Sequence, residues 1–317
     1  MISNIAFEIP AELLARVASG EVIRYGTILK DVGTGQIIRH MQETGVAQSV
    51  LSSLTAGPFA PFSIAANVIN AGSGIYTGIK INQLQVMVQM LQSLQVATMG
   101  ISLAGVGVSV AGFYYMHKRI KSLEGNIGQL GAEIRAGFES LDRRDLRKQL
   151  HLTKSLLQRA QQAQALSDPR AEYSEVAAGL ADQAAYFEGE VAFMVKTQGP
   201  INKDDFWRLT QMLMLCNGVR IDCRIRTNEL RHALTVSEAI SSEYNHLFSH
   251  LTPTSFGPAV NEGLTMVRIL RDASDAADSK PYLIDYLRTQ RIQGADYIEA
   301  IEQEKTSPYL LLKTGRD

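Results

Sequence analysis

Cysteine is nearly absent from this 317-residue chain, which contains only Cys216 and Cys223. Seven residues apart in one helix, the two side chains would be separated by about 10 Å along the helix axis, too far for a disulfide. We therefore expect two buried free thiols in a reducing compartment. The N-terminus has early carboxylates and no basic stretch leading into an apolar core, so we expect no secretory signal peptide.

An excess of charge of either sign is missing too. The chain has 31 Lys and Arg against 32 Asp and Glu, a formal net charge of −1. This balance argues against sequence recognition of duplex DNA, and it means that any site for an anion must be a local cluster. The length is typical of two or three structural units.

Charged side chains are almost missing from one long stretch of the chain. Between Glu43 and Lys118 the only Asp, Glu, Lys or Arg is Lys80, whereas both flanks carry an ordinary density of charge. A solvated surface of this length would carry more charge. We therefore interpret residues 46–95 as a membrane-associated segment that leads into a transmembrane helix.

The most apolar part of this stretch is Val96–Met116, which has no charged residue. As a helix it would span about 31 Å, close to the roughly 30 Å hydrocarbon thickness of a bilayer. Two tyrosines near its C-terminal end and the basic sequence HKRIK just after it are typical of a membrane interface. By the positive-inside rule, the C-terminal flank would be cytoplasmic. We therefore predict that residues 96–117 span a bacterial inner membrane.

Small residues recur every four positions in this segment, a spacing that lets transmembrane helices approach closely. The candidate helix-packing or pore residues are Gly100, Ala104, Gly105, Gly107, Ser109, Ala111 and Gly112. Two alternatives remain open. The segment is also compatible with a buried helix of an all-α soluble protein, or with a soluble form that hides the helix until it inserts.

The upstream part of the uncharged stretch is a poorer span. Val46–Ile79 is interrupted by Pro58 and Pro61, which favours a re-entrant or broken helix over a regular crossing. Ile81–Gln95 carries glutamines at five positions among apolar residues. These amides could line a pore, or simply face solvent on a packed helix.

Beyond the basic flank, apolar residues follow a heptad pattern. Isoleucine and leucine alternate at the first and fourth heptad positions, which favours a short parallel coiled coil. The candidate oligomer seam is Ile120, Leu123, Ile127, Leu130 and Ile134. Residues 118–165 are therefore predicted to form a self-associating stalk, with an amphipathic helix inside one subunit as the alternative.

The remainder of the chain is charged, amphipathic and nearly without strand signals, which predicts a cytoplasmic domain of five or six helices over residues 166–317. Helix breaks are expected at Ser167–Pro169, Gln198–Asp205, Leu251–Pro258, Ser279–Pro281 and Thr306–Pro308, with Asn202 or Asp204 as a cap. Residues 1–45 differ. There, a short helix precedes EVIRYGTILKD and GQIIRHMQE, which we interpret as the two strands of a β-hairpin around the turn VGTG.

These patterns together predict a mainly α fold. It comprises a small N-terminal β-hairpin, one or two transmembrane helices, a coiled-coil stalk and a C-terminal helical bundle.

The sequence contains few motifs that are typical of an enzyme. The VGTG sequence lacks the pattern of a phosphate-binding loop. Glu243, His246 and His250 share a helical face, but the spacing lacks the glutamate of zinc-protease helices and no second ligand cluster is evident. We therefore predict no catalytic residue, no metal site and no cofactor.

The best candidate for ligand binding is a group of arginines in the sequence CNGVRIDCRIRTNELRH. If one helix runs through it, Arg220, Arg224 and Arg231 fall near one face, with Arg226 beside them. Guanidinium groups suit phosphate, so the group is a candidate site for an anionic ligand. Interleaved acids could instead pair with these arginines as structural ion pairs.

Three segments follow one another in the first half of the chain: GEVIRYGTILKDVGTGQIIRHMQETG, an uncharged region ending GVGVSVAGF, and a heptad pattern. In this order they resemble a group of bacterial membrane effector proteins. The channel subunit of Hailong-type antiphage systems is one example. The resemblance covers about residues 8–140 and carries over no functional residue. It implies an oligomeric channel gated by a nucleotide or oligonucleotide on its cytoplasmic domain.

The predicted function is therefore that of a homo-oligomeric, pore-forming membrane effector with a ligand-sensing helical domain. We expect the protein to contact membrane lipid and to depolarise the membrane during antiphage defence. The alternative is a soluble helical toxin or interaction scaffold with a conditionally buried apolar hairpin.

Overall fold

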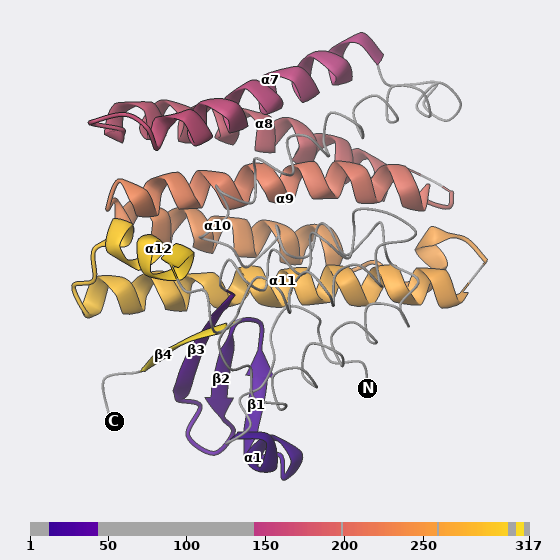
Figure 1. Ribbon diagram of the computed structural model, residues 1–317. Helices are drawn as coiled ribbons and strands as arrows, with labels where there is room; N and C mark the ends of the chain where they lie inside the picture. Colours follow the sequence, from indigo (N-terminus) through magenta and orange to yellow (C-terminus); the bar gives the residue numbers. More distant parts are fainter. Residues whose placement is uncertain (1–12, 44–142, 198, 259, 304–308, 314–317) are drawn as a thin grey trace, which may run out of the picture.

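The computed structural model describes residues 13–43, 143–197, 199–258, 260–303 and 309–313. Helices dominate this part of the chain, as predicted, and a small antiparallel sheet accompanies them (Figure 1). The principal helices are α7 (Arg143–Ala163), α8 (Arg170–Lys196), α9 (Lys203–Arg226), α10 (Leu230–Phe248), α11 (Val260–Thr289) and α12 (Gly294–Gln303). The sheet comprises β1 (Val22–Tyr25), β2 (Ile28–Asp31), β3 (Ile37–Glu43) and β4 (Tyr309–Lys313), and it follows the short helix α1 (Leu14–Ala18).

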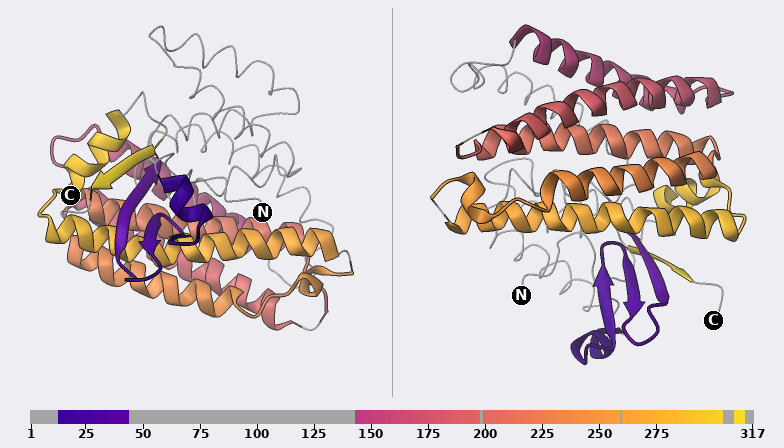
Figure 2. Two further views of the ribbon diagram at one scale, coloured as in Figure 1. Left: turned by 90° about the horizontal axis from the view of Figure 1, so that it is seen from below. Right: turned by 180° about the vertical axis from the view of Figure 1, so that it is seen from behind.

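The long helices lie side by side, from α7 at the top of Figure 1 to α11 below it. The right-hand view of Figure 2 shows the same stack from behind. Helix α7 packs on α8, α8 on α9, and α10 on α11. Their core contains large, fully buried side chains such as Phe187, Phe206, Leu213 and Tyr244. The sheet lies against the α11 side of this helical body.

Several predicted helix breaks are confirmed. Ser167–Pro169 separates α7 from α8, and Leu251–Pro258 contains the short 3₁₀ helix η2 (Pro253–Phe256). Before α9, the Asn202 Oδ1 atom accepts a hydrogen bond of 3.2 Å from the backbone N–H of Asp205, which is the predicted capping interaction. Thr306–Pro308 lies outside the described residues.

The break predicted at Ser279–Pro281 is wrong, because α11 continues through Pro281. A proline inside a helix removes one backbone hydrogen bond and usually kinks or ends it. Here Leu283 and Ile284, which follow the proline, are buried in the same core as the preceding turn. Core packing on both sides of the proline offsets the lost bond.

The N-terminal sheet is larger than the predicted single hairpin. EVIRYGTILKD is itself a hairpin, with β1 and β2 paired antiparallel so that Tyr25 lies opposite Ile28. Gly26 permits this turn because its φ of 54° belongs to the left-handed region that favours glycine. The predicted VGTG turn is present and connects β2 to β3. The error was to count β1 and β2 as one strand.

The fourth strand comes from the opposite end of the chain. β4 pairs antiparallel with β3, which places Leu310 opposite Gln42. The strand order in the sheet is β1-β2-β3-β4. The prediction of a helical domain over residues 166–317 missed this strand. The N-terminal and C-terminal parts of the chain therefore complete one sheet.

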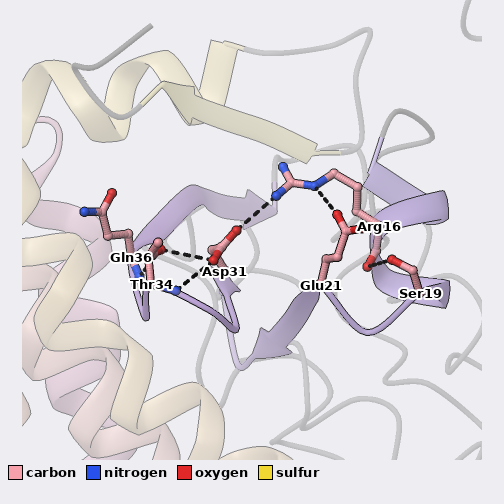
Figure 3. A network of polar contacts seen from close by, with 6 residues as sticks. All are labelled: Arg16, Ser19, Glu21, Asp31, Thr34 and Gln36. Atoms are coloured by element: carbon pink, nitrogen blue, oxygen red, sulfur yellow. Dashed lines mark hydrogen bonds and ion pairs between the residues drawn. The ribbon is translucent and has the colours of Figure 1, made fainter.

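A polar network fixes α1 to the hairpin (Figure 3). The guanidinium group of Arg16 contacts Glu21 at 3.3 Å and Asp31 at 3.0 Å. Asp31 also accepts hydrogen bonds from the backbone and hydroxyl of Thr34. The Thr34 backbone bond is the main reason why the pKa of Asp31 lies below its usual range. The network holds the turn between β2 and β3 in place.

Both cysteines lie on α9 as buried free thiols, as predicted. Burial raises the pKa of Cys216 to about 12 and raises that of Cys223 as well. Neither thiol is therefore activated as a nucleophile.

No helix within the described residues is long and apolar enough to cross a membrane. The predicted span Val96–Met116, its packing residues and the seam Ile120–Ile134 all lie outside the described part of the chain.

Candidate functional site

A shallow hollow of about 720 Å³ lies where α9 turns into α10. Its lining residues are Arg224, Asn228, Glu229, Leu230, Arg231, His232 and Thr235. Asn228 makes the turn with a φ of 60°, a left-handed conformation that asparagine tolerates better than most residues. Its Oδ1 atom also accepts a 3.0 Å hydrogen bond from the backbone of Gly294, which ties the turn to α12.

The charges in this hollow are partly compensated. Arg224 donates to Glu229 at 2.6 Å and to the hydroxyl of Ser174 at 3.4 Å, so its guanidinium group is held in position. Arg231 and His232 are exposed in the first turn of α10. Unpaired backbone N–H groups at a helix start favour negative charge. The hollow thus brings two arginines and the start of α10 to one surface, where Glu229 compensates the charge of Arg224.

The structure separates the four predicted arginines. Helix α9 ends at Arg226, and Arg231 belongs to α10, so the idea of one continuous helical face is wrong. Asn228 reverses the chain between them. Arg224 and Arg231 line the hollow, whereas Arg220 and Arg226 do not.

Arg220 belongs to a second, more buried group of polar side chains between α8, α9 and α10. It interacts electrostatically with Glu243, which also faces Glu188. The pKa of Glu243 is raised to about 7, mainly by burial and to a lesser extent by repulsion from Glu188. The Oε1 atom of Glu243 is buried without a hydrogen-bond partner. A charged carboxylate at this position is therefore unfavourable.

Replacing Glu243 with glutamine should raise the free energy of unfolding by about 1–2 kcal/mol at pH 8. A carboxyl group whose pKa is raised in the folded state stabilises the protein fully below its unfolded pKa of 4.5, and that contribution is lost as the pH rises through about 7. The neutral amide removes this loss. Urea unfolding at pH 4.5 and pH 8 measures the difference.

The matched control is Glu238→Gln, an exposed position on the same helix. It should leave the stability unchanged at both pH values. An equal gain for Glu243→Gln at pH 4.5 and pH 8 would contradict the titration of Glu243 as its cause.

Glu243, His246 and His250, which share a helical face in the sequence pattern, have different surroundings in the structure. Glu243 faces the buried group just described, while His246 and His250 are exposed. Within the described ranges, no group of three or more His, Cys, Asp or Glu side chains could hold a metal ion.

The junction between the sheet and α11 forms a third polar region, which we call the polar seam: Tyr25, Thr27, Lys30 and His40 of the sheet with Asp278, Ser279, Tyr282 and Tyr286 of α11. The hydroxyl of Tyr25 donates to Asp278 at 2.5 Å. The backbone N–H of Thr27 donates to the Ser279 hydroxyl at 3.0 Å, and the two hydroxyls are 2.8 Å apart. These bonds connect the β1–β2 turn to the middle of α11.

Two cationic or titratable side chains of the sheet complete the polar seam. The ammonium group of Lys30 lies 4.8 Å from the ring centre of Tyr25 and 4.5 Å from that of Tyr282, a favourable cation–π geometry. His40 contacts Tyr286 with ring centres 5.1 Å apart. Burial lowers the pKa of His40 to about 4, so its ring is neutral at physiological pH. Sequence reasoning missed this region entirely.

Comparison of the chain with protein-family models, with curated proteins and with solved structures finds no match in any of the three. The resemblance to membrane effector proteins therefore stays a prediction.

Proposed function

We propose that this chain is a membrane effector that assembles a homo-oligomeric pore, with its folded body as the ligand-sensing part. The observation that carries the proposal is the position of the two ends of residues 44–142, which contain the uncharged stretch. Glu43 ends β3, and Arg143 begins α7. Strand β3 is paired with β4, and the sheet is bonded to α11. Both ends of residues 44–142 therefore belong to one folded body.

A body that holds both ends lies on one side of a membrane. A segment that leaves it and returns must then cross the bilayer an even number of times. This supports two crossings, one by Val96–Met116 and one within residues 46–95, over a single crossing. The basic sequence after Met116 favours the cytoplasmic side of a bacterial inner membrane for the body.

The ligand that fits the hollow is an anion with a phosphate group, such as a nucleotide or oligonucleotide. Arg224 and Arg231 would supply the positive charge, and the α10 N-terminus would supply backbone donors. Depolarisation of the membrane in antiphage defence is the role that the sequence resemblance adds to this proposal.

Reporter fusions test the arrangement. We expect reporters at residue 1 and at residue 317 to be active in the cytoplasm, and the protein to stay in the membrane pellet after alkaline carbonate extraction. A single crossing would place the two ends on opposite sides and would prevent the pairing of β3 with β4. Periplasmic activity at either end would therefore contradict the proposed topology.

Fractionation separates this proposal from its alternative. A chain recovered wholly in the soluble fraction, with no effect on membrane potential, would favour the soluble toxin or scaffold.

A further inference from the structure

The sheet and the helical body have separate apolar clusters. Leu13, Val22, Leu29 and Met41 form the small cluster of the sheet, and the helices share a much larger one. A sheet with its own cluster can keep its structure without being fused to the helical core. The directional contacts of the polar seam then determine how firmly the sheet is docked.

Asp278 connects the polar seam to a further helix, α10. Its Oδ2 atom accepts the hydrogen bond from Tyr25 of β1. Its Oδ1 atom accepts hydrogen bonds from Ser241 and, at 2.9 Å, from Asn245, both on α10. One carboxylate oxygen therefore faces α10 and the other faces the sheet. Donors on Oδ1 orient the carboxylate for Tyr25.

Helix α10 also connects this carboxylate to the hollow. The first turn of α10 lines the hollow, and Ser241 lies 11 residues after Leu230 in the same unbroken helix. At 1.5 Å per residue, the two points are about 16 Å apart along one rod. A small shift or rotation of α10 at the hollow would move the donors that orient Asp278.

We propose that Asp278 is a latch that couples α10 to the docking of the sheet. When Ser241 and Asn245 hold the carboxylate, it retains Tyr25 and the sheet stays on α11. When α10 moves, the carboxylate loses its orientation and the sheet is held less firmly, by its remaining contacts with α11. Because β3 ends at Glu43, a loosened sheet would loosen one end of the proposed membrane segment. The biological meaning of the latch rests on the proposed function, whereas the coupling itself does not.

Hydrogen exchange of the full-length protein, measured strand by strand, tests the coupling without any assay of membrane potential. Tyr25→Phe removes the donor on the sheet side, and we expect amides of β1 and β2 to exchange about tenfold faster. Amides of α8 and α9 should keep their rates. A failure of pore activity with this exchange pattern intact would disprove the proposed function and leave the latch standing.

The decisive variants lie on α10. Ser241→Ala and Asn245→Ala each remove a donor to Asp278, and neither change touches the Tyr25 hydroxyl. We expect each to accelerate exchange in β1 and β2 by about fivefold. Combined with Tyr25→Phe, they should add little, because the bond that they orient is already gone. Ser242→Ala, at an exposed position of α10 next to Ser241 and outside the hollow, is the control and should leave the sheet unchanged.

Two outcomes would overturn the latch. One is exchange in β1 and β2 that stays within about twofold of the parent in both α10 variants, which would make Asp278 a local contact. The other is equal acceleration in α8, α9 and the sheet, which would show general destabilisation of the body.

Discussion

Gly26→Ala should destabilise the docked sheet by about 2–4 kcal/mol, more than any single substitution within the adjoining polar seam. A Cβ atom at this position would lie 2.1 Å from the carbonyl oxygen of Asp275 and 2.7 Å from the Ser279 hydroxyl. The first of these atoms belongs to the backbone of α11 and cannot rotate away. The residue also has a φ of 54°, which adds the conformational cost of a left-handed alanine.

Two other glycines, in the turns before β1 and between β2 and β3, separate these effects. Gly20 and Gly35 have φ values of 78° and 67°, and nothing lies within 4 Å of an added Cβ. Alanine at either position should therefore cost only the conformational part, about 1 kcal/mol. Urea unfolding of the three variants, with hydrogen exchange of β1 and β2, measures the difference. Equal losses in all three would show that the turn does not pack closely on α11.

The helices and most of their ends could be predicted, because local signals determine them. Ser167–Pro169 interrupts the apolar period, and Asn202 precedes α9 with a side chain suited to a cap. The free state of both cysteines followed from their spacing of seven residues along one helix. Each of these features depends on residues within a few positions of one another.

The errors share a different origin, since each depends on residues distant in the sequence. Pro281 stays inside α11 because of core packing that local rules do not include. The sequence YLLLK gives no alternation, and leucine favours helices, so β4 is recognisable only beside β3. The turn at Gly26 was missed inside EVIRYGTILKD, and its contact with Asp275 could not be read from either segment alone.

In the candidate site, too, the features set by neighbouring residues were predicted and those set by distant residues were not. The arginines at the end of α9 were found from their composition, although the turn at Asn228 divides them between two helices. The polar seam was missed because an acid such as Asp278 in a charged stretch is typical of a solvated helix face. Its role appears only when Tyr25, 253 residues away in the sequence, is seen to bond to it.

Gly105→Leu combined with Gly107→Leu should abolish depolarisation while leaving membrane insertion intact. The basis is the sequence alone, because both residues lie outside the described part of the chain. Leucine keeps the segment apolar enough to insert, but it adds bulk where small residues would let helices approach. The measurement is membrane potential in cells that express the parent or the variant, with carbonate extraction of the same cells.

Val106→Leu with Val108→Leu is the matched control, since it adds side-chain volume at the positions that directly follow the two glycines without removing a small residue. It should insert and depolarise like the parent. A soluble core predicts a different pattern for the glycine variant, because overpacking by two leucines costs roughly 1–3 kcal/mol each and lowers the yield. A glycine variant that aggregates without reaching the membrane would therefore count against a pore. One that inserts and still depolarises cells would show that these glycines do not mediate the assembly.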